Sequence, residues 1–581
     1  MIFNHNAKGS AWRSFSRIAA VAAVGVAMAT PAQAVRFKLA DGAIDGSFDT
    51  TIGWGMNMRT RSHNPTNAGG IAGMYGNRST AKWEVFNNTI KASHDLSLKG
   101  NGWGVFVRGN YSYDQDADHE ELSSSAQNAK VTTGIFTDAY VYFRFGGDDQ
   151  FNLRLGKQVI SWGENTFIGN SINDINTVDL TKLRVPGVEL KDAFVGTPAV
   201  SGSWQINDAF TVEAFALFAF DEFAADPAGG FFLTNDAFGN NLAFPDPTTG
   251  RCVSPDGGGN SAPGPFSPAG AGFGETFCAV SDELASDGGQ WGVALRYYAA
   301  DLGNGVDFGF YYQNLHDHIF KLGAIAGSAN PAFGPLPNGR FYRWFPENIE
   351  RWGLSWNTTV GSWAWGGEYG YRRNMKLQGD ANVILGAVAF GGVNTLNPSA
   401  APIVLTPGTK FDKEGVRDYG HHRVQMTFQR LWGPMPEFRA DQWNTIFEVA
   451  HGWVTSMPGQ STFNRFDENI SNNYQGFRGR SSLTYNNALF NSVNVTFKQA
   501  FNWDIRGNAP TFGGNKEFIE DRKVVSLGLD FDYALRWKWG VSHTWFFDGV
   551  DDYTTYQGTR AEQNNASKDR DFLSFFASYV F

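Results

Sequence analysis

The sequence lacks any long apolar run beyond its first 34 residues, and its mean hydropathy is slightly negative, at −0.31. No later stretch approaches the ~18 uninterrupted apolar residues that a membrane-spanning helix requires. A helical membrane protein is therefore excluded. A membrane β-barrel is not, because only alternate strand residues of a barrel face lipid and because long polar loops dilute the average.

Cysteine and positive charge are also scarce. Two cysteines in 581 residues do not make a disulfide scaffold. The predicted signal peptide takes three of the 47 basic residues with it, which leaves 44 against 57 acidic ones and a net charge of −13. This balance argues against nucleic acid as a partner. The chain also has no zinc-finger spacing and no phosphate-loop motif.

Residues 1–34 have the pattern of a cleaved secretory signal. Three basic residues precede a short apolar run over 18–29, and Ala32-Gln33-Ala34 forms a small-x-small cleavage site. The mature chain is therefore predicted to begin at Val35. The alternative is a cytoplasmic protein with an apolar N-terminal helix.

The mature chain divides into about eighteen strand-like runs. Many alternate cleanly, as in 525–533, where apolar odd positions are separated by small or acidic even ones, and side chains of a strand switch faces at every residue. The predicted strands begin near Gly46, Lys82, Gly102, Gly134, Gln150, Pro198, Phe210, Gly289, Gly305, Ile349, Trp363, Asp418, Gln442, Arg480, Asn491, Asp521, Trp537 and Arg570.

Short and long connections alternate between these runs. Tight turns at 99–102, 146–149, 207–209, 301–304, 361–362 and 535–536 are separated by long segments such as 161–196, 222–288, 315–348, 377–417 and 457–479. Outer-membrane barrels have short periplasmic turns and long extracellular loops, whereas a soluble sandwich or propeller has no reason to alternate. We predict an all-β protein, an antiparallel transmembrane barrel of about 18 strands (range 14–18). A short periplasmic segment would occupy 35–45 and the barrel 46–581, with both termini in the periplasm.

The last strand ends on an aromatic residue, Phe581, and Tyr579 lies on the same face. This ending is typical of the signal that barrel-assembly machinery reads, although an ordinary edge strand can also end in Phe. If the barrel closes, this strand pairs with the one that begins near Gly46. Tryptophans beside the short turns, Trp363 and Trp432 among them, fit an aromatic girdle at the periplasmic interface.

Alternation also predicts which charged residues face the lumen. A lining of mixed sign would set up a transverse field that orients polar solutes; alternatively, the charges pair across strands and brace the wall. The predicted lining residues are Arg108, Arg144, Arg154, Arg296, Arg372, Arg423, Lys498, Glu213, Glu368, Glu448, Asp530 and Asp532.

Three segments resemble a family of Gram-negative outer-membrane β-barrel proteins of unknown function. They are 37–51, the Gly156–Glu164 run that contains Gly-Lys-Gln and Trp-Gly-Glu, and Asp179–Gly187. The resemblance extends over the whole mature chain. It implies a place in the outer membrane, in contact with lipid and lipopolysaccharide. It also implies an association with the metabolism or export of hydrophobic compounds, but no established substrate.

The long connection 161–196 is expected to fold into the lumen and narrow it. A surface cap or a latch against the wall is the alternative. Pro186 should stop the short helix predicted at 179–183. The predicted constriction residues are Asp174, Asp179, Lys182, Arg184, Glu189, Lys191 and Asp192.

Cys252 and Cys278 lie in the longest connection, and in an oxidising compartment we expect them to form a disulfide, with metal binding or free thiols as alternatives. His316-Asp317-His318 and His421-His422 have no third ligand at a fixed spacing, so no metal or other cofactor is predicted. The chain has no nucleophile elbow and no clear Ser-His-carboxylate set, so no enzyme is predicted.

The sequence thus predicts an outer-membrane channel for small hydrophobic or amphipathic molecules. Two alternatives remain open. The first is a surface structural or recognition barrel plugged by its own loops. The second is the outer-membrane part of an exporter, which predicts a periplasmic partner that binds the short turns or residues 35–45.

Overall fold

The computed structural model describes residues 35–63, 80–115, 133–169, 171–224, 226, 230–232, 277–325, 339–378, 410–411, 416–455, 471–510, 517–554, 560–565 and 567–581. The predicted signal peptide and Cys252 lie outside these residues.

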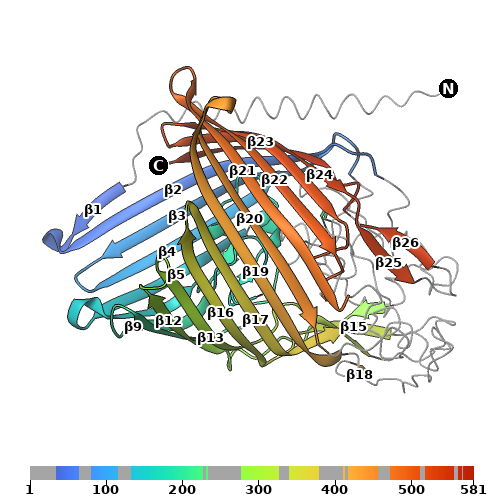
Figure 1. Ribbon diagram of the computed structural model, residues 1–581, viewed down its shortest axis with the longest axis horizontal. Coiled ribbons are helices and arrows are strands. Elements are labelled where there is room, and N and C mark those ends of the chain that lie inside the picture. The colour runs from blue at the N-terminus through green and yellow to red at the C-terminus, as the bar shows by residue number, and fades with distance from the viewer. Residues whose placement is uncertain are drawn as a thin grey trace, which may run out of the picture.

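Eighteen antiparallel strands form one closed barrel, which confirms the predicted fold class (Figure 1). The barrel closes where β27 pairs with β2, from Thr51 opposite Val580 to Arg59 opposite Phe572, as predicted for the last strand. The barrel strands are β2 (Ile44–Arg59), β3 (Val85–Lys99), β4 (Trp103–Asp114), β5 (Thr133–Phe145), β6 (Phe151–Gln158), β9 (Thr197–Gln205), β10 (Phe210–Leu217), β12 (Trp291–Ala299), β13 (Val306–Leu315), β16 (Ile349–Val360), β17 (Trp363–Gln378), β19 (Val416–Met435), β20 (Ala440–Val454), β21 (Asn473–Leu489), β22 (Val493–Arg506), β23 (Lys523–Tyr533), β24 (Trp537–Phe547) and β27 (Phe572–Val580).

A nineteenth strand, β1 (Val35–Leu39), occupies the N-terminal segment in which no strand was predicted. The 3-10 helix η1 (Ala40–Gly42) connects β1 to β2. β1 pairs with the first residues of β2, and β27 pairs with the residues of β2 that follow. The ring of Phe37 lies over Gly46, where a Cβ would come within 2.2 Å of the ring. Phe581 continues the same edge of β2 by donating its backbone N–H to the Thr50 carbonyl at 2.8 Å.

One strand start was predicted wrongly by more than a few residues. β21 begins at Asn473 rather than near Arg480, so it includes residues that were assigned to a loop. The early part of β21 has little apolar alternation. It is held instead by inward contacts: Tyr474 packs on Phe518, and Arg478 pairs with Asp504 at 2.7 Å.

Two small sheets lie beyond the barrel, at the end with the long connections (Figure 1). The sequence analysis treated these segments as loops, because the strands are short and carry no long alternation. One sheet has four strands, β11 (Phe277–Ala279), β14 (Lys321–Ile325), β15 (Gly339–Trp344) and β18 (Lys410–Phe411), and the other is the hairpin of β25 (Val550–Thr554) and β26 (Arg560–Asn564).

The wall of the barrel is uneven in height. Strands β6, β9, β10, β12 and β13 have only 8 to 10 residues, whereas β17, β19, β20 and β21 have 15 to 20. The chain leaves the wall early on its low side, after Gln158, and returns at Thr197. Between these points it forms β7 (Thr177–Val178), α4 (Leu180–Leu183), α5 (Leu190–Ala193) and β8 (Phe194–Val195).

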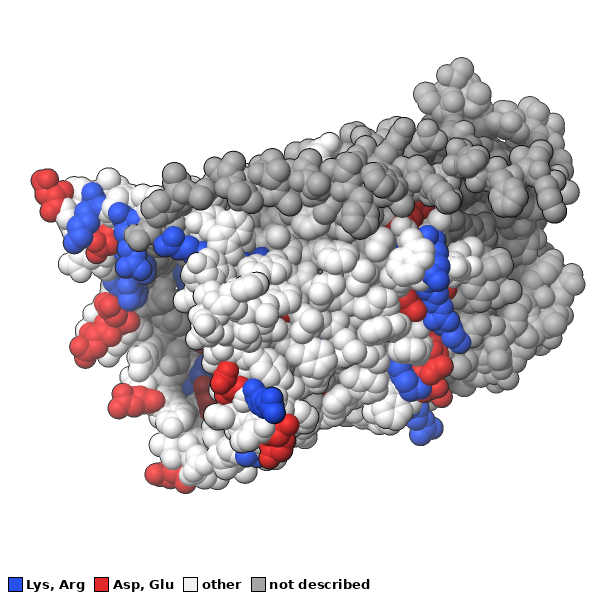
Figure 2. Space-filling model, turned by 90° about the horizontal axis from the view of Figure 1, so that it is seen from above, with Lys and Arg blue, Asp and Glu red and all other residues white. Residues whose placement is uncertain are grey.

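The face of the barrel seen in Figure 2 has a belt without charge between two charged ends. Aromatic residues gather towards both ends of the belt. At the short-turn end Trp432 stacks on Trp443 with ring centroids 4.8 Å apart and meets Trp363 edge-on at 5.6 Å, and near the long connections Tyr312 lies between Trp291 and Trp352, with ring centroids 5.3 Å from each. Two of the turns at this end contain the 3-10 helices η3 (Gly147–Asp149) and η6 (Pro436–Phe438). The belt has the character of a lipid-facing surface flanked by an aromatic girdle.

None of the helices in the described ranges is long and apolar enough to cross a membrane.

Candidate functional site

Residues 159–196, here called the interior segment, lie inside the barrel. Their contacts run along the inward faces of the wall from β10 to β21, and on the opposite side they reach β27, β2 and β3. A segment that touches opposite walls of a closed barrel must cross its lumen.

Two buried carboxylates on the wall hold the first part of the interior segment. Glu448 accepts backbone N–H bonds from Thr166 and Phe167, each at 2.8 Å, and from Ile168 at 3.1 Å. Glu368 does the same for residues 164 and 165, at 2.7 and 3.2 Å. Both glutamates are 0% exposed. Hydrogen bonds from amides to an ionised carboxylate are among the stronger ones in proteins, so this part of the segment is anchored to the wall.

Asp174 forms the third polar anchor. Its Oδ2 lies 2.7 Å from Arg351 Nη1 and 3.0 Å from Arg372 Nη2, so one carboxylate bridges β16 and β17. Burial alone would raise the pKa of Asp174, but the attraction of the two guanidinium groups outweighs it and lowers that pKa. Asp174 therefore stays ionised within the barrel.

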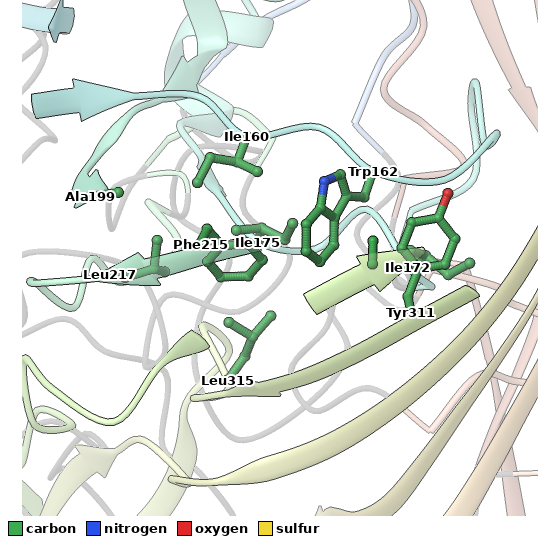
Figure 3. Packing of buried hydrophobic residues seen from close by; sticks show 10 residues of the cluster. Ile160, Trp162, Ile172, Ile175, Ala199, Phe215, Leu217, Tyr311 and Leu315 are labelled. Atoms are coloured by element: carbon green, nitrogen blue, oxygen red, sulfur yellow. The ribbon is translucent and has the colours of Figure 1, made fainter. Parts of the chain in front are cut away.

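An apolar cluster fixes the segment to the low side of the wall (Figure 3). Trp162 lies between Phe215 and Tyr311, with ring centroids 4.8 and 5.6 Å away. Ile172 and Ile175 complete the cluster and are buried. The inward glycine at position 353 makes room for Ile172, since a Cβ there would lie 2.6 Å from it. Burying such side chains contributes on the order of 1.5–3 kcal/mol each.

The second part of the segment, with α4 and α5, lies against β2 and β3. Asn57 Nδ2 donates to the Arg184 carbonyl at 2.8 Å, and Lys91 Nζ donates to the Gly187 carbonyl at 2.6 Å. Gly55 lies directly beneath Pro186, where a Cβ would come within 2.6 Å of the proline carbonyl oxygen. As predicted, the helical turn ends before Pro186.

The seven predicted constriction residues all lie in the interior segment, but their contacts differ. Asp174 bridges two arginines of the wall, Asp179 caps α4 by accepting the Thr181 N–H at 3.0 Å, and Arg184 pairs with Asp226 at 3.1 Å. These three hold structure together. The other four line one pocket, and these are Lys182, Glu189, Lys191 and Asp192.

By strand register, all twelve predicted lining residues fall on the inward face of the wall. Most have partners there. Arg108 pairs with Asp95 at 2.7 Å, Arg296 with Glu213 at 3.3 Å, Arg423 with Glu517 at 2.7 Å and Lys498 with Asp530. Arg144 and Arg154 lie over tyrosine rings, and Asp532 accepts a backbone N–H of the 533–536 turn. These pairs fit the bracing interpretation, and a role in lining a pore stays a prediction.

The polar and ring contacts of the interior segment are confined to part of the wall. Among the described residues, no hydrogen bond, ion pair or ring contact joins it to β22 or β23. An added Cβ at Gly528 on β23 would meet Ser542 of the neighbouring strand rather than the interior segment. The side chain of Lys498, on β22, is 56% exposed although it points inward. Water therefore reaches the inner wall here.

Sequence reasoning missed several wall residues beside the interior segment. Arg351, Asn57 and Lys91 bond to it, and Lys538 lines a pocket with it. Strand parity could have placed them inward, because Lys91 and Lys538 lie at even spacing from predicted lining residues of their own or paired strands. The alternation around them is weaker, since glycine and serine occupy many inward positions.

Cys278 lies in β11, but Cys252 lies outside the described residues, so the predicted disulfide stays a prediction. Within the described ranges no group of three or more His, Cys, Asp or Glu side chains is placed to hold a metal ion. At the C-terminus, Tyr579 packs on Trp537 at 4.5 Å and on Phe581 at 4.8 Å.

Fold and site together define a class of protein: a closed 18-strand β-barrel whose lumen is crossed by one of its own connections. The chain belongs to the family described as "Protein of unknown function (DUF1302)", whose model matches residues 15–581. This confirms the family resemblance. No curated protein matches the chain.

Several solved outer-membrane proteins are similar to it at low identity. OpdK of Pseudomonas aeruginosa with vanillate is 11% identical, with a TM-score of 0.40, and OccK2 (OpdF) of Pseudomonas aeruginosa in complex with glucuronate is 10% identical, with a TM-score of 0.38. A BenF-like porin from Pseudomonas fluorescens Pf-5 is 11% identical, with a TM-score of 0.38. Each match covers 92% of this chain and 98% of the other.

Proposed function

We propose that the protein is an outer-membrane channel whose lumen is narrowed by the interior segment to an off-centre passage. The observation that carries this proposal is the one-sided anchoring described above: the segment is tied to most of the wall, but within the described residues it has no bond to β22 or β23. Barrels of 16 to 18 strands are wide enough to hold an aqueous channel. One crossing segment narrows such a lumen, and the wet wall beside Lys498 marks where it stays open.

The inward face of β22–β24 indicates which class of solute would pass through the channel. It carries the Lys498–Asp530 ion pair together with small or hydroxyl side chains such as Ser526 and Ser542. A wall of this kind favours a water-soluble or amphipathic solute over a purely hydrophobic one. The hydrophobic solute implied by the family resemblance would need an apolar lining, which this wall does not provide.

The outer face supports the proposed location. An uncharged belt flanked by aromatic residues is what a barrel presents to lipid, and Figure 2 shows such a belt between two charged ends. In this orientation the short turns and the end of β27 face the periplasm, and the long connections face lipopolysaccharide and the exterior.

Planar-bilayer recording of the purified, full-length protein tests the proposal. We expect discrete conductance steps, and we expect Lys498→Gln to shift ion selectivity towards cations because it removes a positive charge from the passage. Lys99→Gln, at the short-turn end of β3 and away from the wall of β22–β24, is the matched control. Deletion of residues 170–190 should raise the conductance, provided that the variant keeps its folded gel mobility. Unchanged conductance in that folded deletion would contradict the proposed constriction.

A plugged structural or recognition barrel is the second candidate. The six backbone amides held by Glu368 and Glu448 favour it, because anchors of this kind suit a permanent plug as well as a fixed constriction. A correctly folded barrel that stays electrically silent in the bilayer would select this candidate.

A further inference from the structure

Two adjoining pockets flank α4, and both are lined by Lys182, Val185 and Ser112. Each has a volume of about 50 Å³. The first, here called the lysine pocket, faces the short-turn end of β2, β24 and β27. The second, here called the phenylalanine pocket, faces the other end, beside the start of β3. A molecule that passes α4 therefore meets both pockets, and Lys182 is where they join.

Among the described residues, Lys182 is a buried cation that makes no hydrogen bond through its Nζ. The residue is 8% exposed, and its Nζ finds no hydrogen-bond partner. The nearest carboxylate oxygen, Oδ2 of Asp179, is 3.9 Å away and too distant for one. A buried ammonium group without a hydrogen bond is costly even beside a distant carboxylate, so a group that accepts its hydrogen bonds would be stabilised beside it. This orphan donor is the observation that points to a ligand.

The rest of the lysine pocket carries a surplus of positive charge. Lys91 and Lys191 line it with Lys538, against two carboxylates, Glu189 and Asp192. Lys191 is paired with Glu189 at 2.7 Å, whereas Lys538 has no hydrogen bond or ion pair within the described residues. Asp192 has one oxygen without a partner, which can accept a hydrogen bond from a hydroxyl group or from water. The pocket is therefore suited to an anionic group.

The phenylalanine pocket offers apolar surface next to that charge. Phe86 stacks on Phe231 with ring centroids 3.8 Å apart and meets Phe232 edge-on at 5.4 Å. The acidic residues at this pocket already have partners: Asp226 is paired with Arg184 at 3.1 Å, and Asp114 accepts hydrogen bonds from residues 87 and 88 at 3.0 Å. Because these carboxylates already have hydrogen-bond or ion-pair partners, the phenylalanine rings are the part of this pocket that suits an apolar group.

We propose that this pair of pockets binds a small amphipathic carboxylate, with its carboxylate at Lys182 in the lysine pocket and its apolar part in the phenylalanine pocket. The inference rests on the proposed channel function, for which it names the class of solute. Lys538 connects the site with the open side of the lumen, because it lies on the inward face of β24 beside β23. A carboxylate that enters along β22–β24 can thus reach Lys182 from the lysine pocket.

Isothermal titration of the full-length protein in detergent with hexanoate tests this site. Two other ligands serve as controls. Hexylammonium has the same alkyl chain with the opposite charge, and acetate has the carboxylate without the long alkyl chain. We expect hexanoate to bind more tightly than either. Lys182→Met keeps the length of the side chain and should weaken hexanoate binding about tenfold, the loss expected for one hydrogen bond to a charged group. Lys99→Met is the matched control and should bind as the wild type does.

Phe232→Ala separates the two pockets. It should weaken hexanoate binding but leave acetate binding unchanged, so the ratio of the two affinities reports the apolar pocket even if the variant is less stable. Equal binding of hexanoate by wild type and Lys182→Met, or of hexanoate and hexylammonium by wild type, overturns the proposal. Bilayer conductance without hexanoate binding would reject this site and keep the channel, whereas binding without conductance would keep the site and reject the channel.

Discussion

Glu448 Oε2 accepts the backbone N–H of Phe167 at 2.8 Å and so joins the middle of β20 to a residue 281 positions earlier in the chain. Because Thr166 and Ile168 donate to the same carboxylate, one side chain organises a whole turn of the interior segment. The barrel wall thus determines the path of the segment that crosses it.

Replacing Glu448 by Gln should loosen this turn. A glutamine presents an NH₂ group where the carboxylate accepts backbone N–H bonds, so some of those donors lose their partner. We expect a loss of unfolding free energy on the order of 3 kcal/mol and larger fluctuations of the open-channel current. Urea unfolding in detergent and single-channel recording measure the two effects. Glu437→Gln, on the exposed turn η6, is the matched control, and equal behaviour of the two variants would show that the anchor is unimportant.

Asp174→Asn should destabilise the protein strongly at neutral pH. It would leave Arg351 and Arg372, which are 3% and 7% exposed, without their shared carboxylate. Breaking a buried ion pair on one side typically costs about 3–5 kcal/mol. Asp418→Asn, which breaks an exposed pair with Lys376, should cost at most ~1 kcal/mol.

The same aspartate predicts a pH dependence. The pKa of Asp174 is lowered by the two arginines, so its contribution is fully present above the ordinary aspartate pKa of about 3.9. The contribution is lost as the pH falls through the lowered value in the folded state. The stability gap between wild type and Asp174→Asn should therefore be wide at pH 7 and should narrow only below about pH 4. Thermal unfolding across this range measures it, and a gap that closes between pH 5 and 7 would contradict the assignment.

The barrel could be predicted from the sequence, but most of the contacts at its centre could not. The alternation in 525–533 predicts which side chains face inward, and the tight turns predict where strands end. Both signals are local in the sequence. Parity alone puts Glu448 and Lys91 on the inward side. It cannot show that Glu448 meets residues 166–168, or that Lys91 meets Gly187, because those contacts depend on how the chain crosses the lumen. The start of β21 was predicted wrongly for the same reason, because Tyr474 and Arg478 are held by partners that are distant in the sequence.

Gly55→Ala should disturb the segment beside α4. A Cβ at this position would lie 2.6 Å from the Pro186 carbonyl oxygen, so the segment or β2 must shift. Overpacking of this kind costs about 1–3 kcal/mol. Gly366→Ala is the matched control on another inward glycine, where the nearest atom of the interior segment, Glu164 Cβ, is 3.4 Å away. Urea unfolding should separate the two variants, and equal stability would mean that the contact with Pro186 is loose.

The aromatic end of β27 should matter for assembly more than for the finished barrel. Tyr579 packs on both Phe581 and Trp537 at the short-turn end, and Phe581 also donates its backbone N–H to the Thr50 carbonyl. The double variant Tyr579→Ala and Phe581→Ala keeps that backbone bond but removes the two rings. We expect less folded protein in outer-membrane fractions, measured by heat-modifiable gel mobility. The control is Phe575→Ala, which removes a ring from the same outward face in the middle of β27. Protein refolded in detergent should show a much smaller difference. If both variants assemble equally well in cells, the rings do not serve as the signal for the barrel-assembly machinery.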